Sequence, residues 1–490
     1  MAAEKTFLGQ PRPLATLFLT EMWERFSYYG MRAILVLYLI APPNGDTPPG
    51  QGLGYSAAVA AAIYGSYTSL IYLLPIVGGW VADRLTGPRR AVLFGGIVIA
   101  IGHFVMAVPI EAMFWLGLVA VALGTGLLKP NISAIVGDLY GPHDTRRDAG
   151  FSLFYMGINL GALIAPLVVG FLAESVSYHV AFAAAGVGMV IGLIQYVAGF
   201  KGMGEAGKAV PKPATPVEKR KAGRLLGIVV VGVIAVLVID VVVFGFSVQM
   251  ITIALTITII VVAIGYFVRL FRNPDLSSID RERVRAFAYL FVAAAVFWAI
   301  YDQSGSTLTE FAQDFTDTTF GGWTMPVAWL QAINPIFIII FAPIFAAIWT
   351  ALGRRAPSTP AKFAMALFGV GISFLIMIPP AMAADSAQES AVWWLVGVYL
   401  VQTWSELLLS PNGLSATTKL APAGLLSQML ALWFLAEAVG DSIGGQVVRL
   451  VDVVGYGWYF AILGVTTIGI GVAFTFIVKR IKALMEGADN

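Results

Sequence analysis

Residues 227–244 read GIVVVGVIAVLVIDVVVF, a run of apolar side chains that one carboxylate, Asp240, interrupts. Because a membrane-spanning helix needs about 20 mostly apolar residues, this run predicts a helix that faces lipid. The whole chain has the same character, since 58% of its 490 residues are hydrophobic and 12% are charged. Soluble domains carry roughly 25% charged residues. The composition therefore excludes an ordinary soluble enzyme and a disordered tail protein, and the absence of cysteine excludes a disulfide scaffold.

Fourteen apolar stretches along the chain are long enough to span a membrane. Their centres lie near Phe26, Leu70, Ile99, Ala122, Leu160, Met189, Ile234, Thr258, Ala293, Ile338, Phe374, Val401, Ala438 and Ile468. The sequence thus predicts an all-α membrane protein with fourteen transmembrane helices in a lipid bilayer. Its net charge of +2 is too small to indicate binding to nucleic acid.

The positions of Lys and Arg predict the orientation of these helices, because short cytoplasmic loops retain basic residues. The loops after every second span are basic, as in residues 84–90, 201–224 and 479–482. Alternate loops, such as residues 302–324, contain no Lys or Arg, and Arg449 is the only basic residue expected on the outer side. Both termini are therefore expected on the cytoplasmic side.

The segment 201–222 is rich in Gly, Pro and charged residues, a composition typical of a flexible linker. Two almost purely apolar spans follow it, and such helices are expected to face lipid without carrying chemistry. Without them, six spans remain on each side, which is typical of transporters with two halves around a midplane site. We therefore predict a six-helix bundle over residues 1–200, a cytoplasmic linker over 201–222, two inserted helices over 223–272 and a second six-helix bundle over 273–490.

The first span contains four charged residues within the stretch TEMWERFSYYGMR: Glu21, Glu24, Arg25 and Arg32. A charge within the bilayer costs about 2.5 kcal/mol or more and is normally paired or functional. Glu21 and Arg25 have the i,i+4 spacing of an ion pair on one helix face. One alternative is a neutralised structural pair, and another is a cluster that reaches water at the cytoplasmic end. We favour a functional cluster, because four charges exceed what helix packing requires.

Three further polar residues stand within other spans. Lys129 precedes a proline, which breaks the helix and leaves a backbone carbonyl without its helical hydrogen bond. We therefore favour a Lys129 that lines a cavity over one whose side chain extends to the membrane interface. Asn159 alone is equally typical of a hydrogen bond between helices. Glu406 is an isolated carboxylate that must be protonated or meet a cation. It is therefore a candidate for proton exchange or for binding a ligand amine.

The two halves of the chain differ in the sign of their membrane charges. The first half offers the cations Arg32 and Lys129, and the second offers the anion Glu406. A ligand with a carboxylate at one end and an ammonium at the other satisfies both. Asn159 and Asn334 are then expected to bond amide groups of that ligand, while Tyr and Trp side chains form adaptable walls. The sequence leaves the role of Glu437 open between a pore residue and the partner of a cation.

Four features form a specific combination: ExxERFxYYG from Glu21 to Gly30, GTGxxKPN ending at Asn131, FYxxINxG from Phe154 to Gly161, and Glu406. Together they resemble the proton-dependent oligopeptide transporter family. The loop from Asp83 to Arg90 resembles the cytoplasmic hinge motif of the major facilitator superfamily, lengthened by one residue. The resemblance covers essentially the whole chain. It implies the fold of that superfamily, with two six-helix bundles and two extra helices between them as in bacterial members.

The resemblance implies a monomer in the bacterial inner membrane that imports di- and tripeptides with protons by alternating access, with no other cofactor. It assigns proton coupling to Glu21, Glu24 and Arg25, the peptide carboxyl end to Arg32 and Lys129, the amino end to Glu406, and the peptide backbone to Asn159 and Asn334. The resemblance also implies that the pocket is lined by Tyr28, Tyr29, Tyr64, Trp298 and Trp433, with Tyr67 as a weaker alternative to Tyr64.

The end of the seventh span departs from the family pattern. Tyr301 and Asp302 stand where some bacterial relatives have paired glutamates. Asp302 alone is therefore expected to form a gate interaction with Arg32 or Lys129.

Three other functions are less consistent with these residues. The nearest alternative keeps the fold and carries nitrate or another small anion, but the Glu406 carboxylate would repel it. An intramembrane enzyme needs a nucleophile with a base or a metal cluster, and the spans contain no HExxH motif and no carboxylate cluster with ligand spacing. A passive channel does not require opposite charges divided between two halves. We therefore expect a transporter and not an enzyme.

Overall fold

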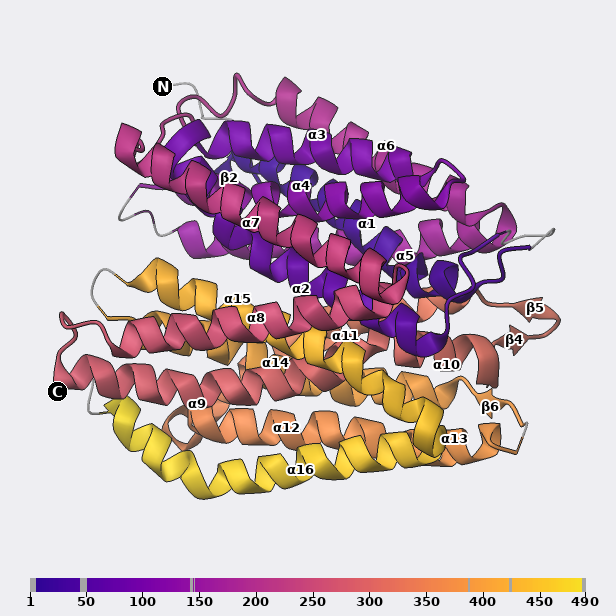
Figure 1. Cartoon of the computed structure of the whole chain (residues 1–490). Helices are drawn as coiled ribbons and strands as arrows, with labels where there is room; N and C mark the ends of the chain where they lie inside the picture. The colour runs from indigo at the N-terminus through magenta and orange to yellow at the C-terminus, as the bar shows by residue number, and fades with distance from the viewer. Residues whose placement is uncertain are drawn as a thin grey trace. The chain divides into compact units, whose positions relative to one another are not determined.

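The computed structural model describes residues 6–44, 51–141, 144, 146–386, 388–422 and 425–486, and helices dominate it (Figure 1). The α-helices are α1 (Pro13–Ile40), α2 (Ala57–Val81), α3 (Pro88–Met106), α4 (Glu111–Asp138), α5 (Arg147–Ser175), α6 (Tyr178–Ala198), α7 (Pro216–Phe244), α8 (Val248–Phe271), α9 (Ser278–Tyr301), α10 (Thr307–Phe315), α11 (Ile333–Leu352), α12 (Thr359–Ile376), α13 (Ile378–Ala384), α14 (Trp393–Leu420), α15 (Leu426–Val447) and α16 (Val451–Glu486).

Short elements connect these helices. The π- and 3-10-helical turns are η1 (Ala82–Thr86), η2 (Asp302–Gly305), η3 (Val327–Ala332), η4 (Gly353–Arg355) and η5 (Val448–Leu450). Three two-stranded pairs are formed: β1 (Thr6–Phe7) antiparallel to β2 (Gln10–Pro11), β3 (Thr316–Asp317) parallel to β6 (Ser390–Ala391), and β4 (Thr319–Phe320) antiparallel to β5 (Trp323–Thr324).

The helices agree with the apolar pattern of the sequence. Each of the fourteen predicted span centres lies within one of the α-helices. Within the described residues, eleven helical segments are long and apolar enough to cross a membrane. One of these segments, Gln428–Met485, includes most of both α15 and α16. The helical architecture predicted from the sequence is confirmed, and the number of fourteen transmembrane helices stays a prediction.

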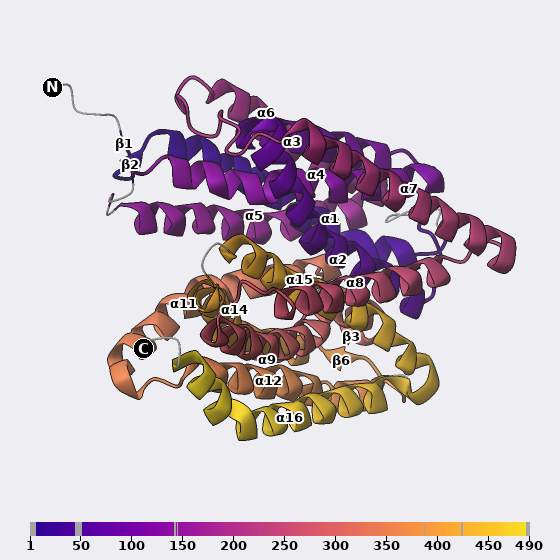
Figure 2. The same ribbon diagram turned by 60° about the vertical axis from the view of Figure 1, so that its left-hand side comes forward.

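The chain packs into two compact units. The first comprises Met1–Gly54 and Leu70–Ile251, and the second comprises Tyr55–Ser69 and Thr252–Asn490. Within the first unit, α1 packs on α5 and α6, and α3 packs on α4 and α6. Within the second, α12 packs on α14 and α16, and α9 packs on α15 (Figure 2). The four-part division predicted from the sequence stays a prediction.

Glycines allow α2 and α4 to approach closely within the first unit. A Cβ atom on Gly78 would overlap the carbonyl oxygen of Gly126, so no larger residue fits there. Asn131 strengthens the contact, since its Nδ2 donates to the carbonyl oxygens of Gly78 (3.2 Å) and Leu127 (2.6 Å). The glycine and asparagine of the GTGxxKPN motif therefore have a packing role. Lys129 lies on the same helix.

The linker before α7 is bound to the first unit, so the flexibility expected from its composition is wrong for this segment. Arg89, at the start of α3, is buried, and its Nη2 donates to the carbonyl oxygens of Gly204 (3.0 Å) and Ala206 (2.6 Å). Its backbone N–H donates to the Gly207 carbonyl at 2.8 Å. A buried guanidinium that donates to two backbone oxygens fixes the path of these residues.

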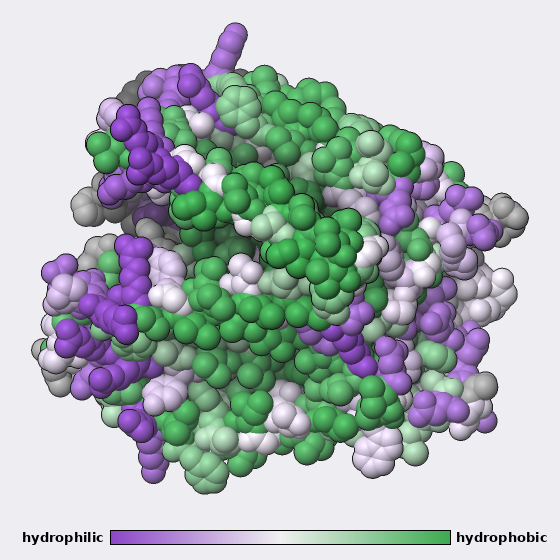
Figure 3. All heavy atoms as spheres, in the orientation of Figure 1, coloured by the Kyte–Doolittle hydropathy of each residue, from purple (hydrophilic) through white to green (hydrophobic). Residues whose placement is uncertain are grey.

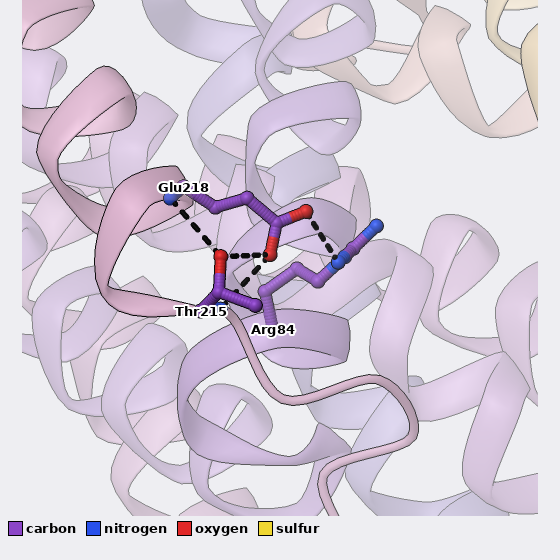
Figure 4. Close-up of polar contacts among 3 residues, drawn as sticks. All are labelled: Arg84, Thr215 and Glu218. Atoms are coloured by element: carbon purple, nitrogen blue, oxygen red, sulfur yellow. Dashed lines mark hydrogen bonds and ion pairs between the residues drawn. The ribbon is translucent and has the colours of Figure 1, made fainter.

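The start of α7 is held to the same unit (Figure 4). Thr215 and Glu218 form a capping box in which each side chain meets the other's backbone N–H, and Pro216 occupies the first turn. Glu218 Oε1 also lies 3.0 Å from Arg84 Nη1 in η1. Because both side chains are partly exposed, this ion pair contributes little stability and mainly directs the start of the helix.

The two inserted helices differ from one another. Nearly all apolar side chains of α7 are exposed, and Figure 3 shows hydrophobic residues along it, as expected for a helix that faces lipid. In contrast, α8 buries Thr252 and Thr256. Thr256 Oγ1 accepts hydrogen bonds from Ser442 Oγ (2.8 Å) and Gln446 Nε2 (3.2 Å) of α15. Helix α8 thus makes polar contacts with α15, and the absence of chemistry in the two inserted helices stays a prediction.

Candidate functional site

Glu21, Glu24 and Arg25 form a buried charged group in α1 of the first unit. Arg25 Nε lies 3.0 Å from Glu21 Oε1 and 2.5 Å from Glu24 Oε2. The three residues are only 3%, 0% and 4% exposed. Among the described residues, Arg25 Nη2 and Glu24 Oε1 have no hydrogen-bond partner. Charge attraction therefore holds the group together more than directional hydrogen bonding does, and one cation serves two carboxylates.

The FYxxINxG motif on α5 covers this group. A Cβ atom on Gly161 would overlap the Met22 carbonyl oxygen and would lie 2.9 Å from the Arg25 Cβ atom. Gly161 thus lets α5 approach α1 at the turn that contains Arg25. The close packing excludes water from the ion pairs, which strengthens the attraction between them and raises the cost of breaking one.

Aromatic rings continue the same face of α1 toward Arg32. The Arg25 guanidinium lies 5.4 Å from the ring centre of Tyr28, and the Arg32 guanidinium lies 5.8 Å from that of Tyr29. The two tyrosine rings pack edge to face at 5.0 Å. These cation–π contacts restrain Arg32 while leaving it partly accessible. The predicted residues of α1 thus form one continuous set.

Lys129 on α4 interacts electrostatically with the charged group of α1. Its Nζ lies 3.9 Å from the ring centre of Tyr72 on α2, and it attracts the Glu21 carboxylate. Asn159 on α5 is buried, and its Nδ2 donates to the Tyr155 carbonyl of its own helix at 3.0 Å. The structure therefore associates Lys129 with the charged group, whereas the Asn159 amide bonds to its own helix.

Glu406 on α14 lies in a hydrogen-bonded network within the second unit. Its Oε2 accepts from the Tyr301 hydroxyl at 2.5 Å and from Asn334 Nδ2 at 3.0 Å. Asn334 Nδ2 also donates to Tyr301 Oη (2.9 Å) and Thr403 Oγ1 (3.0 Å). Helices α9, α11 and α14 thus bring Asn334 and Glu406 together as a paired amide and carboxylate.

Three other predicted residues line one small cavity in the second unit: Tyr64, Trp298 and Asp302. Asp441, a buried carboxylate on α15, lines it as well. The cavity joins the predicted gate residue Asp302 to two predicted pocket aromatics. Gly305 allows the backbone to approach Tyr64 closely, because a Cβ atom there would overlap the Tyr64 hydroxyl.

Trp433 lies apart from this cavity. Its ring packs against Gly413 and lies 6.2 Å from the ring centre of Phe363. Glu437, one turn further along α15, is buried. Among the described residues, no group of three or more His, Asp or Glu side chains is placed to hold a metal ion.

The sequence reasoning missed two residues of the hydrogen-bonded network around Glu406, Tyr301 and Thr403. Tyr301 was recognised only as a departure from the family pattern, and Thr403 was not considered. Thr403 stands three residues before Glu406 on the same helix, a spacing that places both on one face. That spacing was available in the sequence. The contact with Tyr301 was not, because it depends on how α9 packs against α14.

Known peptide transporters are similar to this chain over nearly its whole length. The chain is 42% identical over 493 residues to a di-/tripeptide transporter of Lactococcus lactis subsp. cremoris, and the match covers 98% of each chain. A crystal structure of the peptide transporter POT in complex with sulfate superposes with a TM-score of 0.93 at 44% identity, covering 98% of this chain and 97% of that one.

A second solved structure is similar over the same extent. A POT family transporter in complex with 5-aminolevulinic acid superposes with a TM-score of 0.91 at 36% identity, covering 98% of each chain. The family model described as the POT family matches residues 89–459. The chain therefore belongs to the POT family of proton-coupled peptide transporters.

Proposed function

We propose that this protein imports di- and tripeptides together with protons by alternating access. The observation that carries the proposal is the Glu406 carboxylate, held within the second unit by the Tyr301 hydroxyl and the Asn334 amide. Such a carboxylate is suited to bind the cationic amino end of a peptide. The relatives reported above are named as peptide transporters, and they give no support to nitrate as the cargo.

Each predicted site residue keeps the role that the sequence suggested. Arg32 and Lys129 bind the peptide carboxylate, Glu406 binds the amino end, and Asn159 and Asn334 contact the peptide backbone. The cations fit this role because Arg32 stays partly accessible beside Tyr29. The lining residues are Tyr28, Tyr29, Tyr64, Trp298 and Trp433.

Proton coupling rests on the charged group of α1. Protonation of Glu21 or Glu24 removes one of the two anions that share Arg25, which changes the energy of the group. Asp302 contributes a gate interaction with Arg32 or Lys129 in one conformation of the cycle. Coupling follows if proton and peptide both favour the same conformation. No other cofactor is required.

The proposal includes fourteen transmembrane helices with both termini in the cytoplasm of a bacterial cell, in the inner membrane, and a monomeric transporter. Helices α1 and α14 are not among the eleven candidate spans in the described residues, because α1 carries four charged residues and α14 is rich in polar side chains. Adding them and separating α15 from α16 gives fourteen. The basic residues in alternate loops support the orientation.

A competition assay tests the substrate class. In proteoliposomes, we expect di- and tripeptides to inhibit uptake of labelled dialanine, and tetrapeptides and nitrate to leave it unchanged. Glu406→Gln is expected to lower dialanine uptake at least tenfold, because a neutral amide does not attract an ammonium.

The chain offers a matched control for that variant. Glu310 is a buried glutamate of the same unit, and its Oε1 accepts from the Tyr456 hydroxyl at 2.5 Å. Glu310→Gln is expected to retain uptake. Inhibition by nitrate, or equal loss in the two variants, would contradict the proposed function.

A further inference from the structure

We propose that Tyr301 is a positioning residue that orients Glu406 toward the α-amino group of the substrate, and so sets the selectivity for peptides with a free amino terminus. The inference rests on the proposed role of Glu406 and adds a residue to it. Tyr301 is the last residue of α9, whereas Glu406 lies on α14.

The hydrogen bonds of the network have a defined direction. The Thr403 hydroxyl donates its one proton to the Tyr399 carbonyl at 2.8 Å, so its oxygen accepts from Asn334 Nδ2. Asn334 Nδ2 likewise donates to the Tyr301 oxygen. The Tyr301 hydroxyl proton is then directed to Glu406 Oε2. Donation from Asn334 to the Tyr301 oxygen polarises the Tyr301 hydroxyl, which strengthens its bond to Glu406.

The last bond joins Tyr301 to one oxygen of the Glu406 carboxylate. Tyr301 Oη and Glu406 Oε2 lie 2.5 Å apart, within hydrogen-bonding distance. Asn334 Nδ2 donates to the same oxygen at 3.0 Å, so two donors from α9 and α11 hold Glu406 Oε2 in place. On the proposed function, a carboxylate held in this way binds the ammonium group of the substrate.

Neighbouring aromatic rings hold the Tyr301 ring in place, so Tyr301 can restrain the Glu406 carboxylate. Its side chain is 8% exposed. The ring stacks on Phe297 at 5.4 Å and meets Trp298 edge to face at 5.1 Å. A ring held on two sides cannot follow a carboxylate that rotates away. Tyr301 thus selects one orientation of Glu406, which lowers the cost of ordering that side chain when substrate binds.

Replacing Tyr301 with phenylalanine tests the inference. We expect Tyr301→Phe to raise the KM for dialanine about tenfold in a counterflow assay, with the maximal rate changed less than about twofold. N-acetyl-dialanine, which lacks the cationic amino group, is expected to compete equally weakly against the variant and the unchanged protein. A general loss of structure would instead alter the maximal rate and the apparent affinity for both ligands.

Tyr456→Phe is the matched control. It removes a hydroxyl that donates to another buried glutamate, Glu310, at the same distance of 2.5 Å. We expect its KM for dialanine to stay unchanged. If Tyr301→Phe does not fold, Tyr301→Gln and Tyr301→Leu provide the same comparison. Only the glutamine retains a hydrogen-bond donor, so Tyr301→Gln is expected to have the lower KM for dialanine.

The outcomes separate the inference from the function on which it rests. Failure of the unchanged protein to transport dialanine would overturn the proposed function. If the unchanged protein transports dialanine and Glu406→Gln raises its KM, an unchanged KM in Tyr301→Phe overturns the inference alone. Equal KM values for the glutamine and leucine variants overturn it as well.

Discussion

Glu21→Gln is expected to abolish accumulation of dialanine against its gradient while leaving exchange of dialanine across the membrane within about threefold of normal. Glutamine cannot take up a proton, and it cannot form the charged contact with Arg25 that lies at 3.0 Å. For one charge moved through 100 mV, about 2.3 kcal/mol is available, enough for roughly fiftyfold accumulation. The variant should lose this accumulation in proteoliposomes with an inside-negative potential.

Asp240→Asn is the control for this variant. Asp240 is a buried carboxylate of the same unit, at the far end of α7, where its Oδ2 accepts from the Ser247 backbone N–H at 2.8 Å. We expect it to accumulate dialanine normally. A Glu21→Gln protein that still concentrates dialanine would exclude Glu21 as a coupling residue.

Arg25→Gln is expected to destabilise the protein more than any other single change in α1. The substitution leaves the carboxylates of Glu21 and Glu24 buried without their common cation. Loss of one partner from a buried ion pair costs about 3–5 kcal/mol. We expect a large fall in the thermal unfolding midpoint in detergent and little monodisperse protein.

Neutralising the two carboxylates should reverse this loss. The triple variant Glu21→Gln, Glu24→Gln and Arg25→Gln carries no buried charge in the group, so its unfolding midpoint should recover most of the way while transport stays absent. Arg32→Gln is the control, since Arg32 is partly accessible and should cost much less. A triple variant as unstable as Arg25→Gln would show that packing, and not charge, determines the stability of this region.

The helices were predictable because each span carries its own hydropathy signal. Every predicted centre lies in a helix, since apolar length alone determines these segments. The linker was not predictable from its Gly and Pro content. Its order comes from Arg89, whose guanidinium binds the carbonyls of Gly204 and Ala206. Composition does not reveal a hydrogen bond between a side chain and distant backbone.

The candidate site was predictable to the extent that its residues share a helix. Glu21 and Arg25 form the ion pair that their spacing indicates. The pairing of Asn334 with Glu406 joins two helices, and the sequence placed both residues at one ligand site without predicting the hydrogen bond between them. Tyr301 was not predicted as a partner, because its hydroxyl reaches Glu406 through the packing of α9 against α14.

The most direct test of proton-coupled peptide import uses the unchanged protein in proteoliposomes that contain a pH-sensitive dye. With an inside-negative potential, external dialanine should acidify the interior, with a half-saturating concentration equal to that for dialanine uptake. N-acetyl-dialanine and nitrate should cause no acidification at the same concentration. Uptake of dialanine without acidification would contradict proton coupling, and acidification by nitrate would contradict peptide as the cargo.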